Sequence, residues 1–182
     1  MSGHTAADEP QASTAVRIVT LVLPILAVLG VLIAAFVYTR NPALEPVGLG
    51  PVPAPKAQSA ACTSLRTALP ADLGDYRSAQ LRDPAPAGAQ AWRRPDGGEP
   101  VVLRCGVERP LDFVVGAGLQ QIDSVQWFQA TGDGLSTWYA VDRGVYVALT
   151  LPDDSGPTPL QDVGAAIAKS MPAQPLDPGA AR

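Results

Sequence analysis

The most constraining feature of this sequence is the uninterrupted apolar segment at residues 18–38, IVTLVLPILAVLGVLIAAFVY, which has 21 residues and no charge. An α-helix rises about 1.5 Å per residue, so a helix of this length spans about 30 Å, the thickness of a bilayer's hydrocarbon core. The apolar region of a cleaved signal peptide is shorter, about 7–15 residues, and no small-residue cleavage site follows this segment. We therefore expect residues 18–38 to form an uncleaved transmembrane signal anchor.

The orientation of this anchor does not follow from its flanking charges. Arg17 precedes the segment and Arg40 follows it, so the Lys and Arg residues near its ends give no positive-inside signal. The tail at residues 1–17 is short, as in an ordinary signal anchor, and both cysteines lie in the C-terminal part of the chain. We expect a cytoplasmic tail, a single pass through the cell membrane, and a C-terminal part outside the cytoplasm.

The rest of the chain divides by composition into a spacer, a domain and a tail. Residues 39–59 contain five prolines, which predicts a semi-rigid, Pro-rich stalk. Residues 60–172 are long enough for one extracytoplasmic domain with its own core. Residues 173–182 carry little that could be buried, and we expect a disordered tail.

The two cysteines of the chain both fall on apolar faces of predicted elements. Cys105 occupies the apolar face of an alternating segment at residues 101–107, which is typical of a half-buried strand. Cys62 lies on the apolar stripe of a short helix that begins at the cap residue Ser59 and ends before Pro70. A buried thiol would explain Cys105 alone. In an oxidising compartment, however, we expect a Cys62–Cys105 disulfide, which the chain-entropy model values at roughly 4 kcal/mol.

The remaining pattern of the domain predicts mostly antiparallel strands between two helices. A second helix is expected to begin at Thr158 as N-cap and to end before Pro172. Residues 111–123 fit no single element. The other expected elements are a short strand at 76–81, a hairpin of 89–94 with 101–107, a strand at 124–129, and a hairpin over 136–151. These elements predict the α+β class: a small antiparallel sheet with a helix from each end of the domain, preceded by one transmembrane helix.

Four segments of the chain resemble one known family. They are LRCGVERP at 103–110, SVQW at 124–127, VDRGVYVALTLP at 141–152 and AAIAKSMP at 165–172. Together they are similar to domain of unknown function 3515, a family of actinobacterial proteins with one membrane segment and an extracytoplasmic domain. The resemblance implies a cell-envelope setting and supports a disulfide outside the cytoplasm. It implies no activity, cofactor or catalytic residue.

The residues that usually carry catalysis are scarce. The one histidine, His4, precedes the membrane segment, which leaves the domain without an imidazole base or metal ligand. Asp133, Asp153 and Asp154 follow no metal-ligand spacing and fit solvated turns. The formal net charge of −4 argues against nucleic acid as a partner. We expect no enzymatic activity, no cofactor and no metal.

The remaining candidates for function are surface residues. Trp127 and Trp138 fit core packing on neighbouring strands. Trp92 and Arg104 are expected to lie off the cysteine face of their strands, which makes them the candidate binding surface. Two functions stay open: an interaction or scaffold domain of the cell envelope, and a binding domain for a small envelope ligand such as a lipid or cell-wall fragment.

Overall fold

The protein is described by a computed structural model, which covers residues 14–40, 45–132 and 134–181 and, within the first range, the side chains of residues 22–37. The chain divides into two compact units, residues 1–40 and residues 41–182, which we describe separately. Most of the expected cytoplasmic tail and residues 41–44 of the expected stalk lie outside the described residues. Asp133 does so as well.

The first unit is one long helix, α1, at Thr14–Arg40. It contains the whole apolar segment, with Pro24 inside the helix, and the apolar side chains described along it are exposed. Over the residues described, no helix reaches the length and apolarity needed to cross a membrane. The membrane-spanning role of residues 18–38 therefore stays a prediction.

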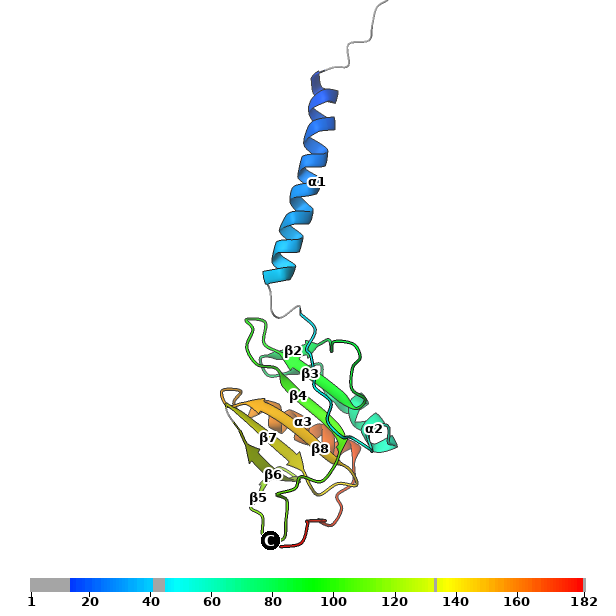
Figure 1. The fold of residues 1–182 in the computed structure, drawn as a ribbon, viewed down its shortest axis with the longest axis vertical. Helices are drawn as coiled ribbons and strands as arrows, with labels where there is room; N and C mark the ends of the chain where they lie inside the picture. The colour runs from blue at the N-terminus through cyan, green and yellow to red at the C-terminus, as the bar shows by residue number, and fades with distance from the viewer. Residues whose placement is uncertain (1–13, 41–44, 133, 182) are drawn as a thin grey trace, which may run out of the picture. The chain divides into compact units, whose positions relative to one another are not determined.

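The second unit is an α+β domain built on one antiparallel sheet of eight strands (Figure 1). The strands follow the order β1-β2-β3-β4-β8-β7-β6-β5, so two four-strand meanders meet where β4 pairs with β8. Their bounds are β1 Asp72–Leu73, β2 Tyr76–Ala79, β3 Ala89–Arg93, β4 Val101–Val107, β5 Leu119–Ile122, β6 Val125–Thr131, β7 Leu135–Ala140 and β8 Tyr146–Pro152. Both expected hairpins are present, as β3–β4 and β7–β8. The residues that fitted no element, 111–123, contain a loop and strand β5.

Helices α2, Ala60–Ala68, and α3, Thr158–Ser170, pack against one face of this sheet, which we call the helix face (Figure 1). As predicted, Ser59 caps α2, its hydroxyl accepting a hydrogen bond from the backbone N–H of Cys62 at 3.3 Å. The expected cap of α3 is wrong. Pro157 is the N-cap with helical backbone angles, so Thr158 is already inside the helix and makes no capping hydrogen bond.

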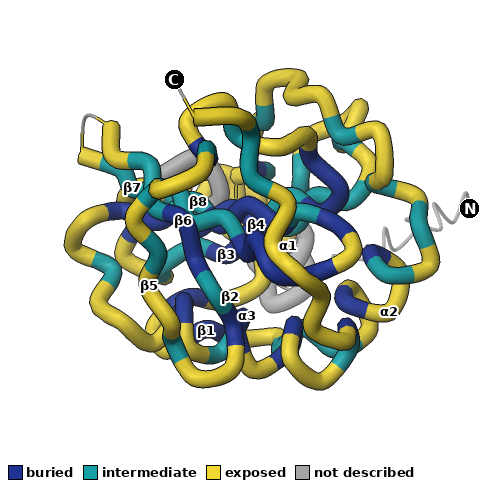
Figure 2. Tube along the Cα trace, turned by 90° about the horizontal axis from the view of Figure 1, so that it is seen from below, coloured by how far each residue is buried: buried dark blue, intermediate teal, exposed yellow. Residues whose placement is uncertain are grey.

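The main hydrophobic core lies between the helix face and the two helices. Trp92 and Trp127 are its largest fully buried side chains, and Trp138 packs against it half-buried. The prediction of core packing for Trp127 and Trp138 is therefore confirmed. Figure 2 shows the central strands mostly in the buried colour and the connecting loops mostly exposed.

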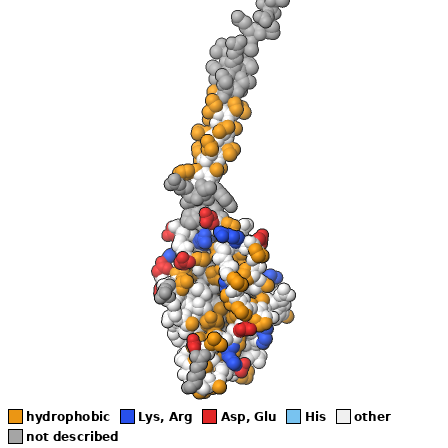
Figure 3. Space-filling view, viewed as in Figure 1, with side chains coloured by type: hydrophobic (Ala, Val, Ile, Leu, Met, Phe, Trp, Pro, Cys, Tyr) orange, Lys and Arg blue, Asp and Glu red, His pale blue; other side chains and the backbone are white. Residues whose placement is uncertain are grey.

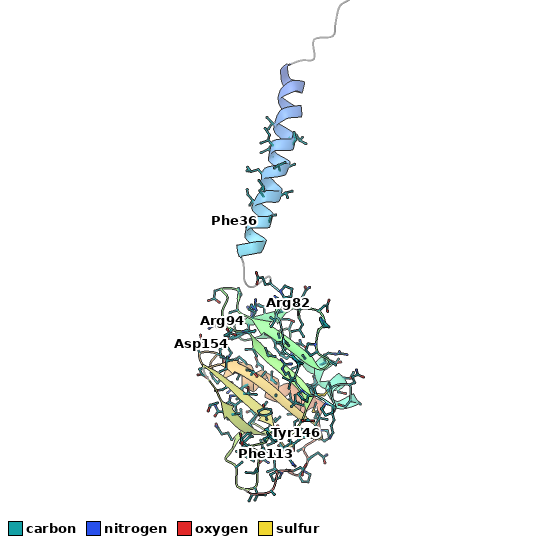
Figure 4. All side chains as sticks on the ribbon, viewed as in Figure 1. Phe36, Arg82, Arg94, Phe113, Tyr146 and Asp154 are labelled. Carbon is teal, nitrogen blue, oxygen red and sulfur yellow. A yellow bond between two sulfur atoms is a disulfide. The ribbon has the colours of Figure 1, made fainter. Side chains whose placement is uncertain are left out.

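The opposite face of the sheet, which we call the open face, carries no helix of this domain. Two small clusters cover its ends: Val47 packs with Ala91 and Val102 at one end, and Phe113 packs with Phe128 and Val141 at the other. The ring of Phe113 also lies near the ring of Tyr146, with their centroids 6.3 Å apart. Both residues are labelled in Figure 4. Between these clusters the open face is not covered to the same extent.

Residues 45–59, expected to belong to a stalk, contact the domain along much of their length. The Val47 amide donates to the Gln80 carbonyl at 2.7 Å and its carbonyl accepts from Arg82 at 2.9 Å. Farther along, the Lys56 amide donates to the Gly106 carbonyl at 3.1 Å. Proline cannot donate a backbone hydrogen bond, but the residues between the prolines can, which lets this segment pack against strands.

The C-terminal residues also differ from the expected disordered tail. The Gly179 amide donates to the Phe113 carbonyl at 2.8 Å, and the Tyr146 hydroxyl donates to the Asp177 carbonyl at 2.9 Å. The Gln174 amide donates to the Asp142 carbonyl at 2.9 Å. These contacts hold the tail over the Phe113 cluster of the open face.

Candidate functional site

The predicted disulfide is confirmed. Cys62 of α2 and Cys105 of β4 are bonded, with Cα atoms 5.6 Å apart and 43 positions apart in sequence. Both residues are buried in the main core, and among the described residues no cysteine is free. The bond attaches the first helix of the domain to the centre of the sheet, and it leaves no thiol for chemistry.

Trp92, half of the predicted binding surface, is in the wrong place for that role. It is fully buried in the main core, and its indole N–H donates to the Pro70 carbonyl at 3.2 Å. In the β3–β4 register Trp92 pairs with Val101, and paired residues of antiparallel strands project from the same face. Val101 and Cys105 share a face, so Trp92 lies on the cysteine face rather than off it.

Arg104 lies on the open face, opposite to Cys105, as predicted. It is half-buried, and its guanidinium makes no hydrogen bond or ion pair with any residue that the structure describes. Burial lowers the pKa of Arg104 below its ordinary value. The guanidinium is partly removed from water, and no described residue supplies it with a counter-charge.

A groove with a volume of about 450 Å³ lies over Arg104 on the open face. Strands β4, β7 and β8 form its floor, and two irregular segments, residues 52–53 and 108–111, form its sides. Figure 3 views this face, and hydrophobic side chains gather over the middle of the domain there. The groove residues are Val52, Pro53, Arg104, Val107, Glu108, Arg109, Pro110, Leu111, Thr137, Tyr139, Ala148 and Thr150.

The strand register explains why this part of the sheet is hollow. Ala148 of β8 pairs with Arg104 on one side and with Tyr139 on the other, so these three residues form one row across the sheet. Neighbouring strands lie about 4.8 Å apart, which separates the Cα atoms of Arg104 and Tyr139 by about 10 Å. A methyl group between two long side chains leaves a depression. Beside it, the hydroxyl groups of Thr137 and Thr150 are hydrogen-bonded at 3.0 Å.

Among the residues that the structure describes, the charges around the groove leave one cation without a counter-ion. At its rim, Arg109 donates to the Asp177 carbonyl at 3.2 Å and lies 3.5 Å from the Asp177 carboxylate. Glu108 is exposed to solvent. Burial raises the pKa of Tyr139, so its hydroxyl stays protonated at neutral pH and can donate. Arg104 is therefore the charge that a ligand in this groove would meet.

The acidic residues singled out in the sequence lie elsewhere. Asp153 accepts a hydrogen bond from the Ser136 hydroxyl at 3.1 Å, on the helix-face side of β7. Asp154 pairs with Arg94, an exposed contact that lowers the pKa of Asp154 (Figure 4). Within the described ranges no three His, Cys, Asp or Glu side chains are placed to hold a metal ion. The absence of a metal, a cofactor and an enzymatic activity stays a prediction.

Sequence reasoning did not identify the groove, although it named Arg104. Tyr139 and Ala148 were read only as alternating strand residues, since their proximity to Arg104 depends on β4 pairing with β8. The buried pair of Asp142 and Arg143, in the loop of the β7–β8 hairpin, was also missed. The Arg143 guanidinium is 2.8 Å from the Asp142 carboxylate and donates to the Ser124 carbonyl at 2.8 Å.

Comparison with known proteins gives a family and no function. No curated protein and no solved structure shows significant similarity to this chain. One family model, described as a protein of unknown function (DUF3515), matches residues 21–176, which is most of the chain. The family expected from the sequence is therefore confirmed, and this chain belongs to the DUF3515 family.

Proposed function

We propose that this protein is a membrane-anchored binding domain of the cell envelope that works outside the cytoplasm and catalyses no reaction. The observation that carries this proposal is the groove on the open face, with the unpaired guanidinium of Arg104 on its floor. A half-buried cation that no described residue neutralises is available to the anionic group of a ligand, whereas a cation already paired within the fold would not be.

The proposed location rests on two features. The apolar segment at residues 18–38 has the length of a bilayer-spanning helix and carries no charge. The disulfide of the domain is of the kind that persists in oxidising compartments and is rare in the cytosol. Both features favour a domain that is held at the outer surface of the cytoplasmic membrane.

The proposal of binding without catalysis rests on the chemistry available in the groove. Its lining offers two guanidinium groups, a phenol, two threonine hydroxyls and a solvent-exposed carboxylate, but neither an imidazole nor a thiol. The groove therefore has no nucleophile paired with a base, which is the usual arrangement for covalent or acid–base catalysis.

The sequence favoured a protein partner, with a small envelope ligand as the alternative. The groove favours the alternative, because it combines a cation with apolar side chains in a hollow whose volume lies within the range of small-molecule sites, about 300–1,000 Å³. A scaffold surface would more typically be a flat exposed patch of several hundred Å².

Two measurements on the full chain test the proposal. Protease added to intact spheroplasts should remove a C-terminal epitope tag, and it should do so without detergent. A domain that is cut only after detergent lysis would contradict the location.

A photo-crosslinking residue at Leu111, on the side of the groove, should form adducts in envelope membranes that the same residue at Arg77, an exposed position of β2, does not form. Equal labelling at both positions would contradict a binding groove. Turnover of an envelope substrate by the purified protein would contradict the absence of catalysis.

A further inference from the structure

We infer that the open-face groove binds a small amphiphile with a single anionic group, a carboxylate or a phosphate, with Arg104 as its counter-ion. The inference rests on the proposed binding function and names the chemical class of the ligand. It depends on four properties of the groove: the unpaired cation, the local charge balance, the apolar sides and the small floor residue.

The unpaired cation determines the sign and the type of the polar group. Arg104 has no partner among the described residues, and it is partly removed from solvent. Guanidinium matches the geometry of a carboxylate or a phosphate through two parallel N–H···O hydrogen bonds. A ligand with such a group would restore the interaction that the fold does not provide for Arg104.

The charge balance limits the ligand to one anionic group in the groove. The neighbouring cation, Arg109, is already engaged by Asp177 at the rim, and Glu108 would repel additional negative charge. One free guanidinium therefore remains for one anionic group. A cationic ligand would bring like charges together over Arg104, which is unfavourable in a partly desolvated site.

The sides of the groove favour an apolar body attached to this anionic group. Val52 is 46% exposed and Leu111 is 82% exposed, although both border the same hollow. Each large apolar side chain covered by a ligand contributes roughly 25 cal/mol per Å² removed from water. A purely ionic ligand such as inorganic phosphate would leave these side chains exposed.

The floor of the groove sets the space for that body. Ala148, a short side chain that is itself buried, lies between the longer side chains of Arg104 and Tyr139 in the same cross-strand row and lines the groove. The Tyr139 hydroxyl makes no hydrogen bond with a described residue and stays protonated at neutral pH, so it can donate to a polar atom of the ligand. A larger residue at position 148 would fill the space directly between the two polar side chains.

Four soluble eight-carbon compounds test the inference on the full chain in nanodiscs of zwitterionic lipid. They are octanoate, octyl phosphate, octanol and octyltrimethylammonium, and acetate and inorganic phosphate serve as anions without an apolar chain. Ligand-observed NMR and calorimetry give the affinities, and empty nanodiscs correct for partition into lipid. We expect octanoate or octyl phosphate to bind, and the other four to bind at least tenfold more weakly. The stronger of the two anions then identifies the source as a carboxylate or a phosphate.

Three substitutions locate the site. Arg104→Gln should weaken binding of the octyl anion by about tenfold or more, since a hydrogen bond to a charged group contributes roughly 1.5–3 kcal/mol. Ala148→Leu should abolish binding by filling the hollow. Arg77→Gln removes an exposed arginine on β2, outside the groove, and should leave the affinity unchanged. Arg104→Gln lies at a half-buried surface position, so the inference stays testable even if Ala148→Leu does not fold.

The outcomes that overturn the inference differ from those that overturn the proposed function. The ligand class is wrong if no octyl compound binds, if octanol binds as tightly as the anions, or if Arg104→Gln leaves the affinity unchanged. In each case the protease test of location still stands on its own. A domain protected in spheroplasts would refute the location, whatever the groove binds.

Discussion

Gly106 is the position at which this fold should be least tolerant of a side chain. The residue follows the disulfide cysteine in β4, where the pairing with β8 shifts register between Cys105 and Val107. Its φ angle is +81°, a left-handed conformation, and a Cβ atom there would lie 2.2 Å from the carbonyl carbon of Lys56. The obstruction is backbone, so no rotamer change can relieve it.

Gly106→Ala should therefore lower the free energy of unfolding by about 2.5 kcal/mol or more. The left-handed conformation costs a residue with a Cβ about 1–2 kcal/mol. Moving residues 56–57 away adds an overpacking cost of about 1–3 kcal/mol. The hydrogen bond from the Lys56 amide to the Gly106 carbonyl would be lost as well, at a net cost of about 0.5–1.5 kcal/mol.

Two other glycines separate these contributions. Gly116 has a φ of +88° but open space around its Cα, so Gly116→Ala should show the conformational cost alone. Gly144 has neither a left-handed φ nor a close neighbour, so Gly144→Ala should be nearly neutral. The ranking of destabilisation should be 106, then 116, then 144.

Urea titration of the full chain in mild detergent measures these values through tryptophan fluorescence. All three tryptophans lie in the domain, and Trp92 and Trp127 are fully buried, so the signal reports the domain rather than α1. If Gly106→Ala costs no more than Gly116→Ala, residues 56–57 do not approach β4 as described. That result would instead support the extended stalk that was expected from the sequence.

The same titration checks three further predictions. Replacing Cys62 and Cys105 together by Ser should lower the free energy of unfolding by up to about 4 kcal/mol, and reduction of the wild type should have the same effect. A double-serine variant that is as stable as the oxidised wild type would contradict the disulfide. Leu149→Ala, at a fully buried site in β8, should cost about 2–5 kcal/mol, and a cost below 1 kcal/mol would place this strand outside the core. Arg143→Ala should lower the free energy of unfolding by about 3–5 kcal/mol, because it leaves the buried Asp142 carboxylate without its cation. No measurable change in stability would show that the pair is solvated.

The sequence by itself determined the elements whose signals are local. The β3–β4 and β7–β8 hairpins follow from alternation of apolar residues around turn residues, and α2 follows from its stripe and its cap at Ser59. The disulfide was also predictable, because the only two cysteines both fell on faces that had to be buried. Periodicity reports which side of an element is apolar, and this information does not depend on the other elements.

Only the tertiary structure decided how those elements meet. The register of the β3–β4 hairpin places Trp92 in the core, whereas the sequence predicted it on the surface. Residues 45–59 and 173–181 show no periodicity, and their contacts with the sheet join positions far apart in the chain. The groove exists because β4 pairs with β8, which brings Arg104, Ala148 and Tyr139 into one row. Long-range strand pairing depends on the combined packing of all the strands, so it cannot be predicted from the local pattern of a single segment.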